Sequence, residues 1–239
     1  VVFDNRSPSL RRPEGDWAIP DMVGTETDPG SAAGKCEVIT FTDNHGGSFA
    51  ELSPQRVRVL LEAWKDRLHE LSQEPYIHHI APFENRGEEV GVTLSHPHSQ
   101  IYAYSYLPPR VQKMLAVAQL HFENTGRVLF DDVLARELKD GDRIIAKNAH
   151  WVAFVPYAAR YSFEIHVAPK VSVADLSELT PEVADAYPAI AKEVLQRLDG
   201  VFDIPMAYIA AWHQAPVREG RDLLRLHWQI TSVRRAPGK

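Results

Sequence analysis

The sequence predicts an α+β protein in which one unit is duplicated, with a largely antiparallel sheet and helices packed on it. The first observation is a repeat: Glu37 and Pro54 recur as Glu164 and Pro181, at one and the same offset, within similar strings. The second is that His98-Ser99-Gln100-Ile101 recurs as His227-Trp228-Gln229-Ile230, at nearly that offset. A nearly constant offset over three landmarks indicates duplication. We therefore divide the chain into halves of similar structure, residues 1–110 and 111–239.

Each half is predicted to contain one long helix that begins at a Ser-Pro or Thr-Pro pair. Ser53 and Thr180 suit the N-cap, and the proline after each suits the first helical position. The helices are expected over residues 54–71 and 181–198, where apolar side chains recur at helical spacing. These apolar residues are expected to pack on the core: Val57, Leu60, Leu61, Trp64, Leu68, Leu71, Val183, Ala186, Tyr187, Ile190, Val194 and Leu198.

The other predicted elements are mostly short strands. They are expected over residues 38–42, 76–81, 90–93 and 101–106, and again over 163–168, 206–212 and 226–232. A connecting helix is predicted over 109–123, and Asp140-Gly141-Asp142 is expected to be a turn between strands. Segments 13–35 and 214–222 have the composition of loops.

Composition excludes several classes of function. The net charge of −6 gives no reason to expect a nucleic-acid partner, and no run approaches the roughly 18 apolar residues of a membrane span. The first residues, VVFDNRSPSL, lack the pattern of a signal peptide. The single cysteine, Cys36, excludes an internal disulfide and suits a reducing cytoplasm; we expect it to be a small buried residue.

The residues that carry chemistry are concentrated in His96-Pro97-His98-Ser99-Gln100. On an extended strand, His96, His98 and Gln100 point to one face. If one ring nitrogen of a neutral histidine donates to a backbone carbonyl, the other is free to attack phosphorus. Gln100 can donate its amide hydrogens to phosphate oxygens but cannot act as an acid. This pair suits a leaving group, such as a sugar phosphate, that departs without being protonated.

These residues resemble the galactose-1-phosphate uridylyltransferases, a branch of the histidine-triad superfamily. The family motif, His-Pro-His-x-Gln preceded by Phe-Glu-Asn-x-Gly, is matched by residues 96–100 and by Phe83-Glu84-Asn85-Arg86-Gly87. The resemblance covers essentially the whole chain, through His227-Trp228-Gln229. It implies an enzyme that exchanges UMP between UDP-glucose and galactose 1-phosphate. It also implies a homodimer, and we expect a cytoplasmic location.

The resemblance also assigns roles to residues. It implies that His98 is the nucleophile that carries UMP and that Gln100 contacts the transferred phosphate. Asn5, Arg6 and Asn85 match positions that hold the nucleotide part of the substrate.

Metal ligands are only partly present. The family's zinc is held by a Cys-x-x-Cys pair and two histidines, for which His45 and His96 are the matching residues. The cysteine pair is absent from this sequence, and we expect it upstream of Val1. Two histidines do not complete a tetrahedral site, so zinc binding stays an open alternative. The family's second metal is not expected, because its ligand positions hold Met114, Thr231 and Val233, and only His213 remains.

Two other interpretations of the site stay open. One is another nucleotidyltransferase or phosphorylase of the same superfamily, acting on a dinucleoside polyphosphate or another sugar nucleotide. It is kept open by Ser7, which stands where the family usually has an aromatic residue for the base. The other is a non-catalytic nucleotide-sugar binding protein, although intact His98 and Gln100 favour an enzyme. A hydrolase would usually have a histidine at position 100.

Two further groups of polar residues are given structural interpretations. His78 and His79 lack matching partners in the sequence and are predicted to be a surface pair. Asp131-Asp132 is predicted to be a solvated helix end rather than a pair of catalytic acids.

Overall fold

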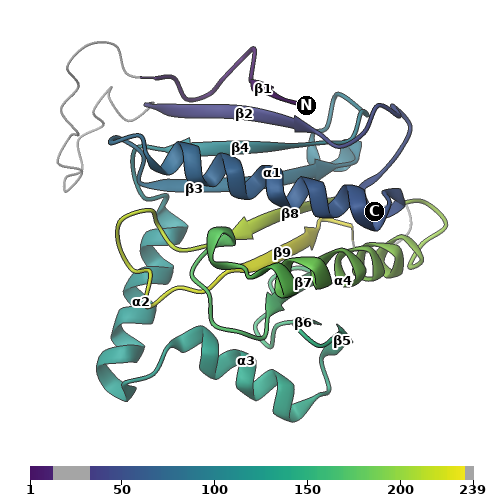
Figure 1. Ribbon diagram of the computed structural model, residues 1–239. Helices are drawn as coiled ribbons and strands as arrows, with labels where there is room; N and C mark the ends of the chain where they lie inside the picture. The colour runs from purple at the N-terminus through teal and green to yellow at the C-terminus, as the bar shows by residue number, and fades with distance from the viewer. Residues whose placement is uncertain (13–32, 235–239) are drawn as a thin grey trace.

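The computed structural model describes residues 1–12 and 33–234. Its centre is one nine-stranded sheet with the strand order β1-β2-β4-β3-β8-β9-β7-β6-β5, in which all neighbours are antiparallel. The strands are β1 (Val2–Asp4), β2 (Gly34–Thr40), β3 (His79–Arg86), β4 (His98–Tyr104), β5 (Ile144–Lys147), β6 (Trp151–Phe154), β7 (Phe163–Pro169), β8 (Tyr208–His213) and β9 (His227–Ser232). The predicted α+β class with an antiparallel sheet is confirmed (Figure 1).

Two long helices lie together on one face of this sheet (Figure 1). They are α1 (Pro54–Ser72) and α4 (Pro181–Asp199), and each ends one residue later than predicted. Ser53 Oγ accepts a hydrogen bond from the Arg56 amide at 3.1 Å, and Thr180 Oγ1 accepts one from the Val183 amide at 3.5 Å. The caps predicted from the sequence are therefore the ones that begin the helices.

Other helices are shorter or lie elsewhere. The connecting helix is α2 (Pro109–Thr125), and it is followed by α3 (Leu129–Asp140). Three 3-10 turns are η2 (Phe49–Glu51), η3 (Glu88–Val90) and η4 (Leu176–Glu178). None of the helices in the described part of the chain is long and apolar enough to cross a membrane.

The main core lies between α1, α4 and the sheet, and it is rich in aromatic side chains. The ring centroids of Trp212 and Trp228 are 6.0 Å apart, and those of Tyr187 and Trp212 are 5.2 Å apart. A buried tryptophan removes roughly 200 Å² from water, which is worth about 5 kcal/mol at the usual coefficient. The ring of Trp64 on α1 also lies 6.1 Å from that of Trp212, so this cluster holds both helices on the sheet.

The two halves are related by an internal pseudo-twofold axis, which reciprocal contacts make visible. Lys65 Nζ donates to the Leu179 carbonyl at 3.2 Å, and Lys192 Nζ donates to the Leu52 carbonyl. The number of residues from Lys65 to Lys192 equals the number from Leu52 to Leu179. Pro54 and Pro181 are the same distance apart in the sequence. The repeat predicted from the sequence is thus a repeat of structure.

In the strands the repeat is shifted by one or two residues. Val38 pairs with Gln100, and His166 pairs with Gln229, so the structural counterpart of Val38 is His166 and not its neighbour Ile165. Glu37 points toward α1, where Arg67 Nε donates to it at 2.8 Å, whereas Glu164 lies on the opposite face and accepts from Gln229. Because strand side chains alternate, a shift of one residue changes the face. The sequence match of Glu37 and Glu164 is not a structural equivalence.

Several predicted elements differ from the structure. The strand expected over 90–93 is absent, because Glu88–Val90 is a 3-10 turn and Gly91 has a φ of 82°. Asp140-Gly141-Asp142 does not join two strands; Gly141, with a φ of 77°, ends α3. This helix has Val128 at its N-cap and no side-chain cap, so the sequence carried no start signal. The short strands β5 and β6 were also not predicted.

The two predicted loop segments differ in outcome. Residues 13–32 of the first loop lie outside the described residues, while Gly34 and Lys35 belong to β2. Segment 214–222 has no helix or strand, but it is not all surface: buried Gln214 donates from Nε2 to the Ile80 carbonyl at 2.9 Å. The predicted division after residue 110 falls near the start of α2 and remains a prediction.

Candidate functional site

His98 is the first residue of β4, half-buried, on the sheet face away from α1 and α4. Its Nδ1 lies 2.7 Å from the carbonyl oxygen of His96. A carbonyl can only accept, so Nδ1 carries the proton and Nε2 of the neutral ring holds a free lone pair. The hydrogen bond expected for a histidine nucleophile is therefore present, and it is made within the His-Pro-His turn itself.

Gln100 and Asn85 are placed beside this ring by the sheet. Burial alternates along β4, so Gln100 shares the face of His98. Gln100 pairs with Phe83 of β3, and two residues further the same register brings Asn85 next to His98. Asn85 Oδ1 is buried and has no hydrogen-bond partner among the described residues. Gln100 and Asn85 thus share the face of His98, one further along β4 and the other across on β3.

Asn5 and Arg6 lie at the edge of the same half. The backbone amide of Asn5 donates to the Cys36 carbonyl at 2.9 Å, and the side-chain Oδ1 of Asn5 accepts from the backbone amide of Ser7 at 2.9 Å. Arg6 is exposed. Cys36 pairs with Tyr102, which is four residues from His98 along β4. This pairing places Asn5 near Tyr102 and not beside the imidazole ring of His98. Cys36 itself is buried, as predicted.

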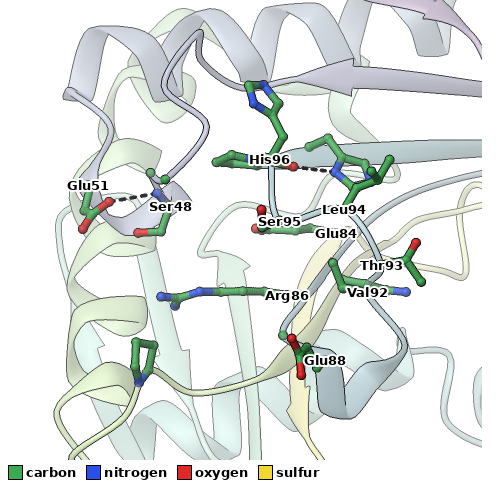
Figure 2. Close-up of a pocket in the computed structure, with 17 residues that line it drawn as sticks. Ser48, Glu51, Glu84, Arg86, Glu88, Val92, Thr93, Leu94, Ser95 and His96 are labelled. Atoms are coloured by element: carbon green, nitrogen blue, oxygen red, sulfur yellow. Dashed lines mark hydrogen bonds between the residues drawn. The ribbon is translucent and has the colours of Figure 1, made fainter.

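A cavity of about 440 Å³ opens beside His98, between β3, the loop before β4 and η2. In Figure 2, Glu84 and Arg86 extend from β3 toward the side of the cavity where Ser48 and Glu51 lie. Glu84 is 6% exposed, and its Oε2 has no partner among the described residues. Burial raises the pKa of Glu84 to about 8, despite nearby Arg86. No local pattern in the sequence signals this, since burial of the strand end depends on helix packing.

This buried carboxyl makes stability depend on pH. Because the folded protein keeps the Glu84 proton up to about pH 8 while the unfolded chain loses it near 4.5, the free energy of unfolding should fall as pH rises between these values. We expect Glu84→Gln to remove this dependence and to be more stable than wild type at pH 8.5, by on the order of 3 kcal/mol. Urea unfolding at pH 5 and pH 8.5 measures it.

Glu88→Gln is the matched control, because Glu88 is exposed on the neighbouring turn. It should follow the wild-type pH curve. If Glu84→Gln and wild type lose the same stability between the two pH values, Glu84 does not stay protonated in the fold.

The structure brings His45 and His96 together, as two ligands of one zinc ion would have to be. Their Nδ1 atoms are 2.8 Å apart. Among the described residues no group of three or more His, Cys, Asp or Glu side chains converges in a way that could hold a metal ion. The pair supplies two imidazole donors, which fit half of a tetrahedral zinc site.

The C-terminal half contains a second copy of the nucleophile arrangement, but it is covered. His227 Nδ1 lies 3.1 Å from the Arg225 carbonyl, as in the His98 turn. Its ring is 2% exposed and stacks under Phe130 of α3 at 4.6 Å, while Arg110 of α2 donates to Gln229 at 2.6 Å. Helices α2 and α3 therefore close in one half the face that is open in the other.

The residues at the second-metal positions are also placed. Met114 packs in a small apolar cluster with Ala118 and Leu224, and His213 stacks on His227 at 5.1 Å. The absence of a second metal remains a prediction.

Two interpretations made from the sequence need correction or refinement. His79 is 4% exposed, so the predicted surface pair of His78 and His79 is wrong: β3 carries His79 into the protein, and burial lowers its pKa to about 4. Asp131 and Asp132 do lie in the first turn of α3, but they are engaged: Asp132 accepts from Arg127 at 2.9 Å and Asp131 from Ser172 at 3.1 Å.

The fold and the site define a duplicated histidine-triad-like protein, in which two equivalent halves share one sheet and one half presents an open histidine. Comparison with protein families is more specific. Residues 26–108 match the model of the galactose-1-phosphate uridyl transferase N-terminal domain, and residues 114–237 match that of the C-terminal domain. The chain belongs to the galactose-1-phosphate uridyl transferase family.

Individual relatives agree with this membership. The chain is 44% identical to a galactose-1-phosphate uridylyltransferase of Streptomyces lividans, over 90% of this chain and 56% of that protein. It is 33% identical to one from Thermotoga maritima, over 92% of this chain and 68% of that protein. The chain thus spans little more than half the length of the Streptomyces relative.

Solved structures give the same result. A uridylyltransferase structure superposes with a TM-score of 0.89 at 31% identity, covering 100% of this chain and 75% of that one. An ADP-glucose phosphorylase from Arabidopsis thaliana has a TM-score of 0.82 at 23% identity, covering 100% of this chain and 73% of that one; it shares the fold.

Proposed function

We propose that this protein exchanges UMP between UDP-glucose and galactose 1-phosphate through a covalent uridylyl-histidine. The observation that carries the proposal is the hydrogen bond from His98 Nδ1 to the His96 carbonyl, which leaves Nε2 free on the sheet face that Gln100 and Asn85 share. Family membership supports the choice of substrates.

The geometry supports a two-step cycle. His98 Nε2 attacks the α-phosphorus of UDP-glucose, the N–P bond forms, and the bond to the oxygen of glucose 1-phosphate breaks with its electron pair. The ring becomes positively charged, and the His96 carbonyl accepting from Nδ1–H stabilises that charge. Galactose 1-phosphate then attacks the phosphorus, giving UDP-galactose and the neutral ring. Gln100 and Asn85 supply amide groups for the phosphate oxygens.

Labelled UDP-glucose tests the proposal directly. The full-length protein, incubated with UDP-glucose labelled in the α-phosphate, should retain label after denaturation, and galactose 1-phosphate should discharge it as UDP-galactose. ADP-glucose with inorganic phosphate is the matched alternative pair. Transfer from ADP-glucose without transfer from UDP-glucose would show another member of the superfamily, and binding without label would show a non-catalytic protein.

We also propose that the whole protein is a cytoplasmic homodimer. Helix α2 supports a dimer, since Val117, Leu120 and Phe122 are exposed apolar residues on a helix with only Val111 and Ala118 buried.

A single zinc ion is proposed for the full-length protein. His45 and His96 would hold it with two further ligands, and it would fix the turn that positions His98. Elemental analysis should find at most one zinc per subunit and no stoichiometric iron, because His213 alone cannot hold a second ion.

Histidine variants make this prediction specific. His45→Ala should lower zinc content to a small fraction, while His69→Ala, at an exposed position of α1, should leave it unchanged. Two tightly bound metals per subunit would contradict the assignment of Met114, Thr231 and Val233 as non-ligands.

A further inference from the structure

An aromatic row runs along the open face of β4, beyond the nucleophile. Tyr102, Tyr104 and Tyr106 follow His98 and Gln100 at every second residue, and all three are half-buried. The ring of Phe83 meets Tyr102 edge-on, with centroids 5.1 Å apart and planes at 77°. An edge-to-face contact covers at most one face of a ring, so Phe83 can brace Tyr102 and still leave one face of Tyr102 for stacking. On this face the polar side chains of His98 and Gln100 are therefore followed by a row of tyrosine rings.

Distance selects one ring of this row. Side chains two residues apart on one strand are about 7 Å apart, so Tyr102 lies about 7 Å from Gln100 and Tyr104 about twice as far. Tyr106 lies beyond the end of β4, on the far side of Tyr104 from Gln100, with its ring centroid 5.4 Å from that of Tyr104. A nucleotide has one ribose between its α-phosphate and its base. With the phosphate at Gln100, the base reaches Tyr102 but not Tyr106. Tyr104 is also engaged, because it stacks with His79 at an interplanar angle of 21°.

The N-terminal segment brings polar groups to the same ring. Cys36 of β2 pairs with Tyr102 of β4, and the backbone amide of Asn5 donates to the Cys36 carbonyl at 2.9 Å. The hydroxyl oxygens of Ser9 and Tyr102 are 3.5 Å apart. The N-terminal segment therefore runs beside Tyr102 and brings the Ser9 hydroxyl to the edge of its ring.

We propose that Tyr102, braced by Phe83, is the stacking surface for the base of the bound nucleotide. This rests on the proposed nucleotidyl transfer at His98, because that function places the phosphate at Gln100. Stacking needs the ring and not its hydroxyl, so the ligand class is a planar heteroaromatic base, and polar groups of the N-terminal segment beside Tyr102 would discriminate between bases.

Three variants of the full-length protein test the assignment: Tyr102→Ala, Tyr102→Phe and the control Tyr106→Ala. Loss of one base–aromatic stack corresponds to roughly 10- to 100-fold in affinity. Tyr102→Ala should raise the Kd for UMP by that factor, as measured by calorimetry. It should raise KM for UDP-glucose by a similar factor. KM for galactose 1-phosphate should change less than about threefold, because the base is already tethered in that step. Tyr102→Phe and Tyr106→Ala should bind UMP like wild type.

The outcomes separate this inference from the proposed function. If wild type binds UMP but transfers nothing, the proposed function fails while the binding comparison still decides on Tyr102. Binding of UMP by Tyr102→Ala within twofold of wild type would overturn the inference. So would an equal loss in Tyr102→Phe, which would assign the effect to the hydroxyl and Ser9. Retained folding of Tyr102→Ala is checked by its thermal unfolding.

Discussion

Replacing His98 by asparagine is expected to abolish the transfer of label from UDP-glucose to the protein. The asparagine amide can still donate to the His96 carbonyl, as Nδ1 does now at 2.7 Å, so the turn before β4 should keep its shape. What is lost is the lone pair of Nε2, and an amide nitrogen is not a nucleophile at neutral pH. We expect the exchange rate to fall by at least about 10⁴-fold. Label incorporation and steady-state exchange measure it.

His227→Asn is the matched control, because His227 makes the same contact to Arg225 in the other half. Its ring lies under Phe130, so the control should be labelled like wild type. A His98→Asn protein that keeps the exchange rate within tenfold of wild type would show that His98 is not the nucleophile.

The two halves show how duplication yields a single open site. Both keep a histidine whose Nδ1 meets the carbonyl two residues earlier, and both keep a glutamine two residues later. The difference is the insertion of α2 and α3, which places Phe130 on His227 and Arg110 on Gln229. The C-terminal half therefore differs from the N-terminal half because helices cover its histidine, and not because it has lost the histidine and glutamine.

Local signals made much of this predictable from the sequence. The Ser53 and Thr180 caps defined the helices, and strand alternation placed His98 and Gln100 on one face. These features depend only on neighbours along the chain. The hydrogen bond to the His96 carbonyl was also inferable, because it spans two residues.

The features that escaped prediction depend on tertiary packing. Glu84 is part of the family motif, but the motif does not show that the folded protein buries its carboxyl group. His79 has the character of a polar surface residue until β3 is seen between β4 and β8. Helix α3 lacks a capping side chain, so its start carried no local signal.

Replacing Gln100 by arginine is expected to reduce kcat by roughly 100-fold and to change KM for UDP-glucose little. Gln100 is half-buried between Val38 and Phe83. In the proposed cycle its neutral amide donates to phosphate oxygens without adding a positive charge beside them. A guanidinium there would bind the uridylyl-histidine more strongly than the transition state that discharges it, or push its oxygens out of line. Turnover should suffer in either case, while substrate still binds.

Single-turnover kinetics locate the loss. The arginine variant should accumulate labelled protein that galactose 1-phosphate discharges slowly. Gln119→Arg adds the same charge on the exposed side of α2, where Gln119 donates to Glu123 at 2.8 Å, and it should keep the wild-type kcat. If the Gln100 variant kept kcat and only KM rose, the glutamine would be a contact of the ground state, and the role of its neutral amide in the transferring step would be wrong.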